Sequence, residues 1–154
     1  MHQRHTIKRT YIILYGVLSG LLLIAPPLWA GPLHDAAEIN DTARIKQLIN
    51  KGNPIGEVDT HGIWPLLAAT SSGSLEAVEL LLELGANPNQ ADQYAYTALH
   101  EASSLGYRDI VDSLIGAKAD MNARDVNGIT PLEYALRSGN PDTVELLQNL
   151  GALQ

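Results

Sequence analysis

The side chains of this 154-residue chain that could do chemistry are mainly histidines and carboxylates, because the chain contains no cysteine. Thiolate catalysis, cysteine metal ligands and disulfide redox chemistry are therefore excluded. His34 and His100 are each followed by a carboxylate, Asp35 and Glu101, which raises the question of a metal site or an acid–base pair. A metal site needs three or four converging ligands. Two catalytic carboxylates must face each other across one substrate.

A strict spacing of 33 residues runs through the chain and decides how these side chains are placed. The positions that share it are Asp59, Asp92 and Asp125; Gly73, Gly106 and Gly139; Leu33, Leu66, Leu99 and Leu132; and Ala36, Ala69, Ala102 and Ala135. Such a period is the signature of a repeat array. His34 and His100 occupy equivalent positions two repeats apart, so they do not converge on one ion or substrate. We therefore expect no enzyme activity, no metal site and no cofactor.

Each repeat has the pattern of two short helices followed by a loop. In the second repeat, the segment 65–72 begins with Pro65, whose fixed φ suits the first position of a helix. Gly73 follows it, as glycines commonly do at helix ends. A second helix is predicted over 75–84, where apolar residues recur at helical spacing. The loop over 86–96 is rich in Asn, Pro and Asp, which favour turns.

The residues at the start of the second helices predict polar caps. Asp41, Ser74 and Asn140 share one register, and their side chains are of the types that cap helix N-termini. Tyr107 stands at the same position in the third repeat, and nothing in the sequence explains it.

These units resemble ankyrin repeats, whose pattern runs D-x-x-G-x-T-P-L-H-x-A-A, a glycine, an apolar helix and G-A-D-x-N. The pattern appears here as "DTHGIWPLLAAT…GANPN", "DQYAYTALHEAS…KADMN" and "DVNGITPLEYAL…GAL" and covers residues 32–154. The resemblance implies an all-α solenoid of about four stacked helix-turn-helix units joined by β-turn or hairpin loops. The expected repeats span about 31–58, 59–91, 92–124 and 125–154.

The second repeat departs from this pattern where the loop meets the first helix. The resemblance implies that the histidine of T-P-L-H ties loop to helix with the hydroxyl three residues before it, and Thr97 and His100 fit that role. Trp64 and Leu67 replace both partners in the second repeat. Replacing both can be nearly neutral, whereas removing one leaves a polar group unsatisfied. We interpret the Trp64–Leu67 pair as apolar packing. The alternative is that Trp64 is exposed as a binding anchor.

The third repeat departs from the pattern at two turn positions. Ala95 stands where Gly62 and Gly128 stand in the neighbouring repeats, and Lys118 replaces a glycine that ends the second helix in the other repeats. If these positions need a positive φ, each side chain costs roughly 1 kcal/mol.

The resemblance also implies a protein-binding surface, because ankyrin arrays usually bind through their loop tips and the exposed side of their first helices. Tyr94 and Tyr96 lie on one tip, and tyrosine offers a large contact area with a polar end. The residues expected to contact a partner are Thr60, His61, Ile63, Gln93, Tyr94, Tyr96, Leu105, Arg124, Asn127, Ile129 and Arg137.

Residues 1–30 have the composition of a secretory signal peptide. Arg4, Lys8 and Arg9 precede fifteen uncharged residues at 11–25, and Ala30 is a small residue at a cleavage position. Fifteen apolar residues fall short of the roughly 20 that span a bilayer. We therefore expect removal of residues 1–30 and a periplasmic or secreted protein. An uncleaved segment that tethers the array to the inner membrane is the alternative.

The charge of residues 31–154 argues against nucleic acid as a partner. Three of the ten Lys and Arg precede residue 31, which leaves seven against seventeen Asp and Glu and a net charge of −10. Such a domain repels phosphate backbones. The leading hypothesis is a monomeric, noncatalytic, exported module that binds a protein, for example one that stabilises, protects or inhibits an exported enzyme. A metal-binding or enzymatic protein is the remote alternative.

Overall fold

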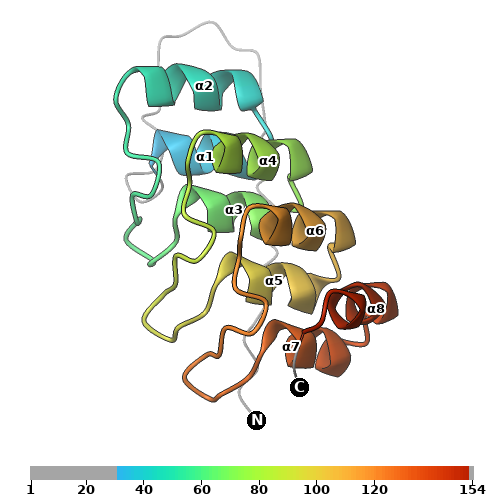
Figure 1. Ribbon diagram of the computed structural model, residues 1–154. Helices are drawn as coiled ribbons and strands as arrows, with labels where there is room; N and C mark the ends of the chain where they lie inside the picture. Colours follow the sequence, from blue (N-terminus) through green and yellow to red (C-terminus); the bar gives the residue numbers. More distant parts are fainter. Residues whose placement is uncertain (1–30, 153–154) are drawn as a thin grey trace, which may run out of the picture.

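The structure is a computed structural model that describes residues 31–152, and the predicted signal segment 1–30 lies outside the described residues. Eight α-helices form within the described part (Figure 1). They are α1 (Pro32–Glu38), α2 (Thr42–Asn50), α3 (Pro65–Ser71), α4 (Leu75–Glu83), α5 (Ala98–Leu105), α6 (Arg108–Gly116), α7 (Pro131–Ser138) and α8 (Pro141–Asn149). Consecutive helices pair, and the four pairs stack in chain order, which confirms the predicted all-α solenoid.

The first and second helices of the pairs form two layers. α1, α3, α5 and α7 lie in one row, α2, α4, α6 and α8 in the other, and the long loops between the pairs project to one side (Figure 1). Each first helix packs against the next first helix, and each second helix against the next second helix. No helix within residues 31–152 has the length and apolar character needed to cross a membrane.

Local sequence explains where the helices begin and end. Pro65 and Pro131 each begin a first helix, where their missing N–H is no loss. Thr130 and Glu133 form a capping box in which each side chain accepts a hydrogen bond from the other residue's backbone N–H. Gly139 ends α7 with a φ of 73°, a left-handed conformation that favours glycine.

The core consists of the residues that share the 33-residue spacing. Ala36, Ala69, Ala102 and Ala135 are fully buried on the first helices, where a small side chain lets neighbouring backbones approach. The leucines of the first helices are buried beside them, each contributing about 2 kcal/mol of hydrophobic stabilisation. On the second helices, Leu81, Leu114 and Leu147 complete the core.

The residues at the start of the second helices join neighbouring repeats, and here one prediction is wrong. Only Asp41 caps its own helix, accepting the Arg44 N–H at 2.9 Å. Ser74 instead donates its hydroxyl to the Glu38 carbonyl at 3.0 Å, and Asn140 donates its amide to two carbonyls at the end of α5. These side chains face the end of the preceding first helix, which offers unpaired carbonyls.

The same geometry explains Tyr107. Its ring lies against Gly73, where an added Cβ would come within 3.1 Å of the ring. The tyrosine therefore packs on the turn that ends α3, in the place where Ser74 and Asn140 form hydrogen bonds. This position holds one repeat to the one before it, by packing or by hydrogen bonding.

The two glycine replacements in the third repeat adopt the strained conformation that the sequence predicts. Ala95 has a φ of 56° and Lys118 a φ of 73°. Non-glycine residues in this left-handed region are disfavoured by contact between Cβ and the backbone. Asn40, which also has a positive φ, belongs to a residue type that tolerates it.

Candidate protein-interaction surface

Three aspartates organise the loop tips that precede the first helices. One carboxylate oxygen of Asp59 accepts the N–H groups of His61 at 2.7 Å and Ile63 at 2.9 Å. Asp92 accepts those of the residues two and four places on at 2.8 and 2.9 Å, and Asp125 does the same at the same two distances. These side chains therefore hold the turn of each tip in place. Their common spacing of 33 residues is the sequence signal for this shared role.

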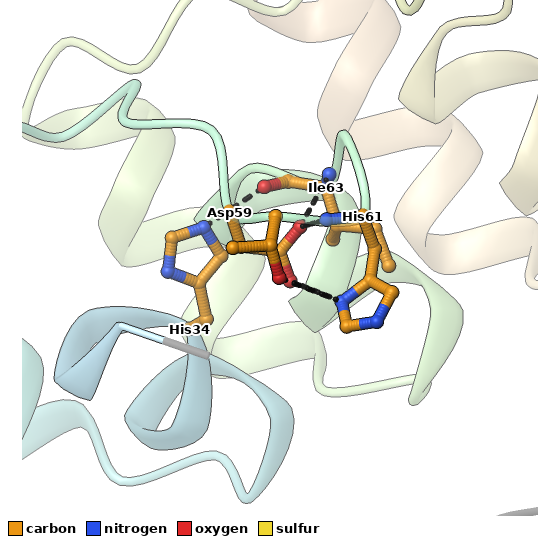
Figure 2. A network of polar contacts seen from close by, with 5 residues as sticks. His34, Asp59, His61 and Ile63 are labelled. Atoms are coloured by element: carbon orange, nitrogen blue, oxygen red, sulfur yellow. Dashed lines mark hydrogen bonds and ion pairs between the residues drawn. The ribbon is translucent and has the colours of Figure 1, made fainter. Parts of the chain in front are cut away.

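The tip of the second repeat is also held by the first repeat. Figure 2 shows His34 reaching from α1 to the loop, where its Nε2 donates to the Ile63 carbonyl at 2.9 Å. Asp59 lies on the other side of the turn, 3.6 Å from Nδ1 of His61. The Nδ1 atom of His34 is buried and has no hydrogen-bond partner within the described chain. Gly31, at the start of α1, has no hydroxyl to offer it.

The equivalent histidine in the third repeat has a complete set of partners. Nδ1 of His100 accepts the Thr97 hydroxyl at 2.8 Å and the Thr97 N–H at 3.2 Å. Its Nε2 donates to the carbonyls of Ala123 and Ile129 at 3.1 and 3.2 Å. Burial lowers the pKa of His100 although these carbonyls and nearby Asp125 favour the charged form. The prediction of a structural histidine that ties loop to helix is confirmed.

Trp64 lies in the core of the second repeat. Only 1% of its surface is exposed, and Leu67 is buried beside the same cluster. The interpretation as apolar packing is confirmed, and the alternative of an exposed binding anchor is wrong. The reason is geometric, because the residue before the first helix points between the loop and the helix layer.

The candidate catalytic carboxylates are not brought together. Asp35 lies on α1 and Glu101 on α5, with α3 between them. Burial raises the pKa of Asp35, opposed by the charges of Arg44 and His34. Glu101 accepts hydrogen bonds from the hydroxyls of Ser71 at 3.1 Å and Tyr96 at 2.8 Å. Across residues 31–152, no three histidines or carboxylates gather in a way that could hold a metal ion.

Nine of the eleven residues predicted to contact a partner are exposed, and two are not. The exposed ones are Thr60, His61, Ile63, Gln93, Tyr94, Leu105, Arg124, Asn127 and Arg137, which we call the tip surface. Ile129 is partly buried, and its carbonyl accepts a hydrogen bond from His100. Tyr96 is buried, with 8% of its surface exposed.

The placement of Tyr96 corrects the expectation that both tyrosines of the third tip face a partner. Its ring lies 5.3 Å from the His100 ring and 5.4 Å from the Tyr134 ring, centre to centre. Its hydroxyl donates to Glu101, so both ends of the side chain are engaged inside the repeat. The turn held by Asp92 directs alternate residues outward and inward, which leaves Tyr94 46% exposed.

Neighbouring tips are joined through Tyr94 and Val126. The Val126 N–H donates to the Tyr94 carbonyl at 2.9 Å, so the third and fourth tips form one continuous surface. Val126 itself is exposed, which adds apolar area beside Tyr94.

The hydrogen bonds of Asp125 show how firmly the fourth tip is held. Burial raises the pKa of this carboxyl, but hydrogen bonds from the Ile129 N–H, the Tyr134 hydroxyl and Asn127 lower it by more. The net pKa therefore lies below the ordinary value. These hydrogen bonds hold the backbone turn from which the outward residues of the fourth tip project.

These features define a repeat solenoid that carries a rigid row of loop tips. A model of three ankyrin repeats matches residues 33–125, and a model of a single ankyrin repeat matches residues 127–153. The chain therefore belongs to the ankyrin-repeat family. Ankyrin repeats are generally protein–protein interaction modules, and the family is typically noncatalytic. A search of curated proteins finds no match to the chain.

Proposed function

We propose that this chain is a noncatalytic, exported protein that binds a partner protein through the tip surface. The observation that carries the proposal is the exposed apolar area on that surface, formed by Ile63, Tyr94 and Leu105 on elements fixed by hydrogen bonds. Apolar and aromatic groups held on rigid elements suit protein binding, because little conformational entropy is lost when they are covered.

The distribution of charge supports this choice of surface. The exposed side of α4, α6 and α8 carries acidic residues, namely Glu76, Glu79, Glu83, Asp109, Asp112, Asp142 and Glu145. The tip surface carries no carboxylate, and its charged members are the arginines Arg124 and Arg137. A partner therefore meets less desolvation cost at the tip surface than on the acidic side, because burying unpaired charges is costly.

Export rests on the composition of residues 1–30. The basic start, the uncharged run at 11–25 and the small residue Ala30 favour cleavage before Gly31, and α1 begins immediately afterwards at Pro32. In the periplasm, the partner would be an exported protein, and an enzyme that is stabilised, protected or inhibited is the form of the proposal that we favour.

The tip surface is tested by capture of partners from the cell envelope followed by mass spectrometry. We expect the Tyr94→Ala/Leu105→Ala variant to lose the partner that the unchanged chain recovers. The matched control is Leu84→Ala, which removes an exposed leucine at the end of α4, away from the tips. Equal recovery with all three proteins would contradict the assignment of the tip surface.

Export and cleavage are tested separately by fractionation and N-terminal sequencing. A chain from the periplasm or medium that begins at Gly31 supports removal of residues 1–30. A chain that keeps its N-terminus and stays with the inner membrane contradicts cleavage and supports the tether.

A further inference from the structure

The face formed by α7 and α8 contains an apolar groove of about 460 Å³ that no residue of the described chain covers. Leu136 lines it and is 47% exposed. The other lining residues are Ala135, Gly139, Asn140, Pro141, Val144, Glu145 and Gln148. In Figure 1 this face lies at one end of the stack, and α1 and α2 lie at the other end. We call it the tail face.

Inside the array, the same positions are covered by the next repeat. Thr70 and Ser103 occupy the register of Leu136, and both are fully buried. Val78 and Val111 occupy the register of Val144 and are also fully buried, whereas Val144 is only partly so. The tail face is therefore the surface on which another helix pair of this kind packs. The sequence signal was Leu136 itself, the only large side chain in its register.

The exposed side of α1 and α2 is the complement of the tail face, and we call it the head face. Arg44 is exposed there, although Ala77 and Ile110 in the same register are buried against a preceding repeat. The described residues 31–152 thus present, at the two ends of the stack, the two halves of the internal repeat interface.

We propose that a second copy of this chain stacks its head face on the tail face, continuing the array from one molecule to the next. The contacts between internal repeats predict which residues meet. Inside the array, Ser71 donates a hydrogen bond to Glu101 of the following repeat at 3.1 Å. At the tail face the position equivalent to Ser71 is Arg137, and at the head face the position equivalent to Glu101 is Asp35. A contact between hydroxyl and carboxylate inside the array becomes one between guanidinium and carboxylate.

The second helices give the same match. Ser113 donates to Glu79 at 3.3 Å inside the array, and the corresponding residues at the two faces are Gln47 and Glu145. α2 carries Arg44 and Lys46 and no carboxylate, whereas α8 carries Asp142 and Glu145 and no base. Arg44 can lay its aliphatic stem in the groove and place its guanidinium near Glu145. Opposite charges therefore face each other across the junction of α8 and α2.

This arrangement is head to tail, so it leaves a tail face and a head face free at the two ends of every assembly. Such heterologous contacts form open chains of copies unless they close into a ring. The contact area corresponds to one repeat interface, so we expect weak, concentration-dependent association. From the sequence we expect a monomer, whereas stacking predicts that copies associate at high concentration.

Sedimentation velocity on the purified protein alone, over a range of concentrations at physiological salt, tests the proposal. Arg137→Asp and Asp35→Arg should each weaken self-association about tenfold, because each places like charges opposite each other. The double variant Arg137→Asp/Asp35→Arg should recover it, since the contact between positions 137 and 35 then again joins opposite charges. Glu83→Lys reverses an exposed charge at the end of α4, in the second repeat and away from both faces, and should change nothing. Circular dichroism confirms that each variant is folded.

A second charge exchange keeps the test decisive if either residue of the first pair disturbs folding. Arg44→Glu and Glu145→Lys should each weaken association, and their combination should restore it. Rescue by either exchange supports head-to-tail stacking. A protein that sediments as a monomer at every concentration, or double variants no better than single ones, overturns it. Because no partner is present, the outcome is independent of the proposed function.

Discussion

The second and third repeats solve the same structural problem by different chemistry. In the third repeat, Thr97 and His100 join loop and helix through hydrogen bonds that also reach the next loop. In the second repeat, Trp64 and Leu67 fill the same space with buried apolar surface. The backbone positions are equivalent in both. This junction therefore accommodates either a hydrogen-bonded pair or an apolar pair, in which both members differ together.

The loop that follows each junction shows why the exchange is tolerated. The Ile129 carbonyl accepts from His100 and also from the Asp125 N–H at 3.1 Å. The corresponding carbonyl after the second repeat, on Tyr96, accepts from the Asp92 N–H at 3.1 Å. Leu67 cannot donate to it, but the carbonyl is already satisfied within its own turn. The apolar pair therefore does not leave the Tyr96 carbonyl without a donor.

The largest effect is expected from emptying the apolar junction. Trp64→Ala should lower the free energy of unfolding by about 3–5 kcal/mol, because it removes a fully buried ring and leaves a cavity. Urea unfolding followed by circular dichroism measures the loss. Tyr94→Ala, which truncates an exposed aromatic residue, should cost under about 1 kcal/mol. Similar losses for the two variants would show that Trp64 does not carry the packing assigned to it.

The next largest effect is expected from converting one kind of junction into the other. Trp64→Thr and Leu67→His should each destabilise the protein by about 2–4 kcal/mol, through a cavity and an unpaired buried polar group respectively. Their combination should cost at least about 1 kcal/mol less than the two single losses added together, since the introduced hydroxyl and imidazole can pair with each other. A double-mutant cycle from urea unfolding measures this coupling. Simple additivity would mean that the two positions do not act as a pair.

The turns of the two repeats differ in the residue at the position of positive φ, which is Gly62 in the second repeat and Ala95 in the third, and the expected change in stability is smaller. Ala95→Gly should stabilise the protein by about 1 kcal/mol, because it relieves a positive φ, and Lys118→Gly should do the same. Gly62→Ala is the reverse change in the second repeat, where an added Cβ meets no atom within 4 Å and only the backbone strain remains. It should therefore destabilise by a similar amount. Thermal and urea unfolding of the three variants check the sign of each change.

The smallest effect is expected in how the free energy of unfolding depends on pH, because only the junction of the third repeat contains a histidine. Burial lowers the pKa of His100 in the folded state, so the unfolded chain binds the proton more readily. The contribution of neutral His100 is complete above the unfolded pKa of about 6.5 and is lost as the pH falls below it. Urea unfolding between pH 8 and 5, roughly the range around that value, should show a steeper loss for the unchanged protein than for His100→Leu. Equal slopes would show that His100 does not titrate differently in the two states.

Much of the fold could be predicted from the residues because its signals are local or periodic. The prolines before α3 and α7, the glycine at the end of α7 and the spacing of apolar residues all act within one or two turns of helix. The positive φ of Ala95 followed from comparing equivalent turns. The exposed members of the tip surface could also be named from their register. The inward turn of Tyr96 could not, since it depends on the aromatic rings of His100 and Tyr134 from two helices.

The repeat and the helix pairs can be predicted from the amino-acid sequence alone, because they depend on periodic spacing and on the backbone preferences of proline and glycine. Contacts between repeats set the role that equivalent positions have in each repeat. Ser74 and Asn140 form hydrogen bonds with the preceding repeat and do not cap their own helices. Trp64 is buried in the core, whereas Leu136 is exposed. Each of these contacts depends on which atoms of a neighbouring repeat lie opposite the side chain. The sequence pattern is nearly the same in every repeat, so it does not reveal these neighbours.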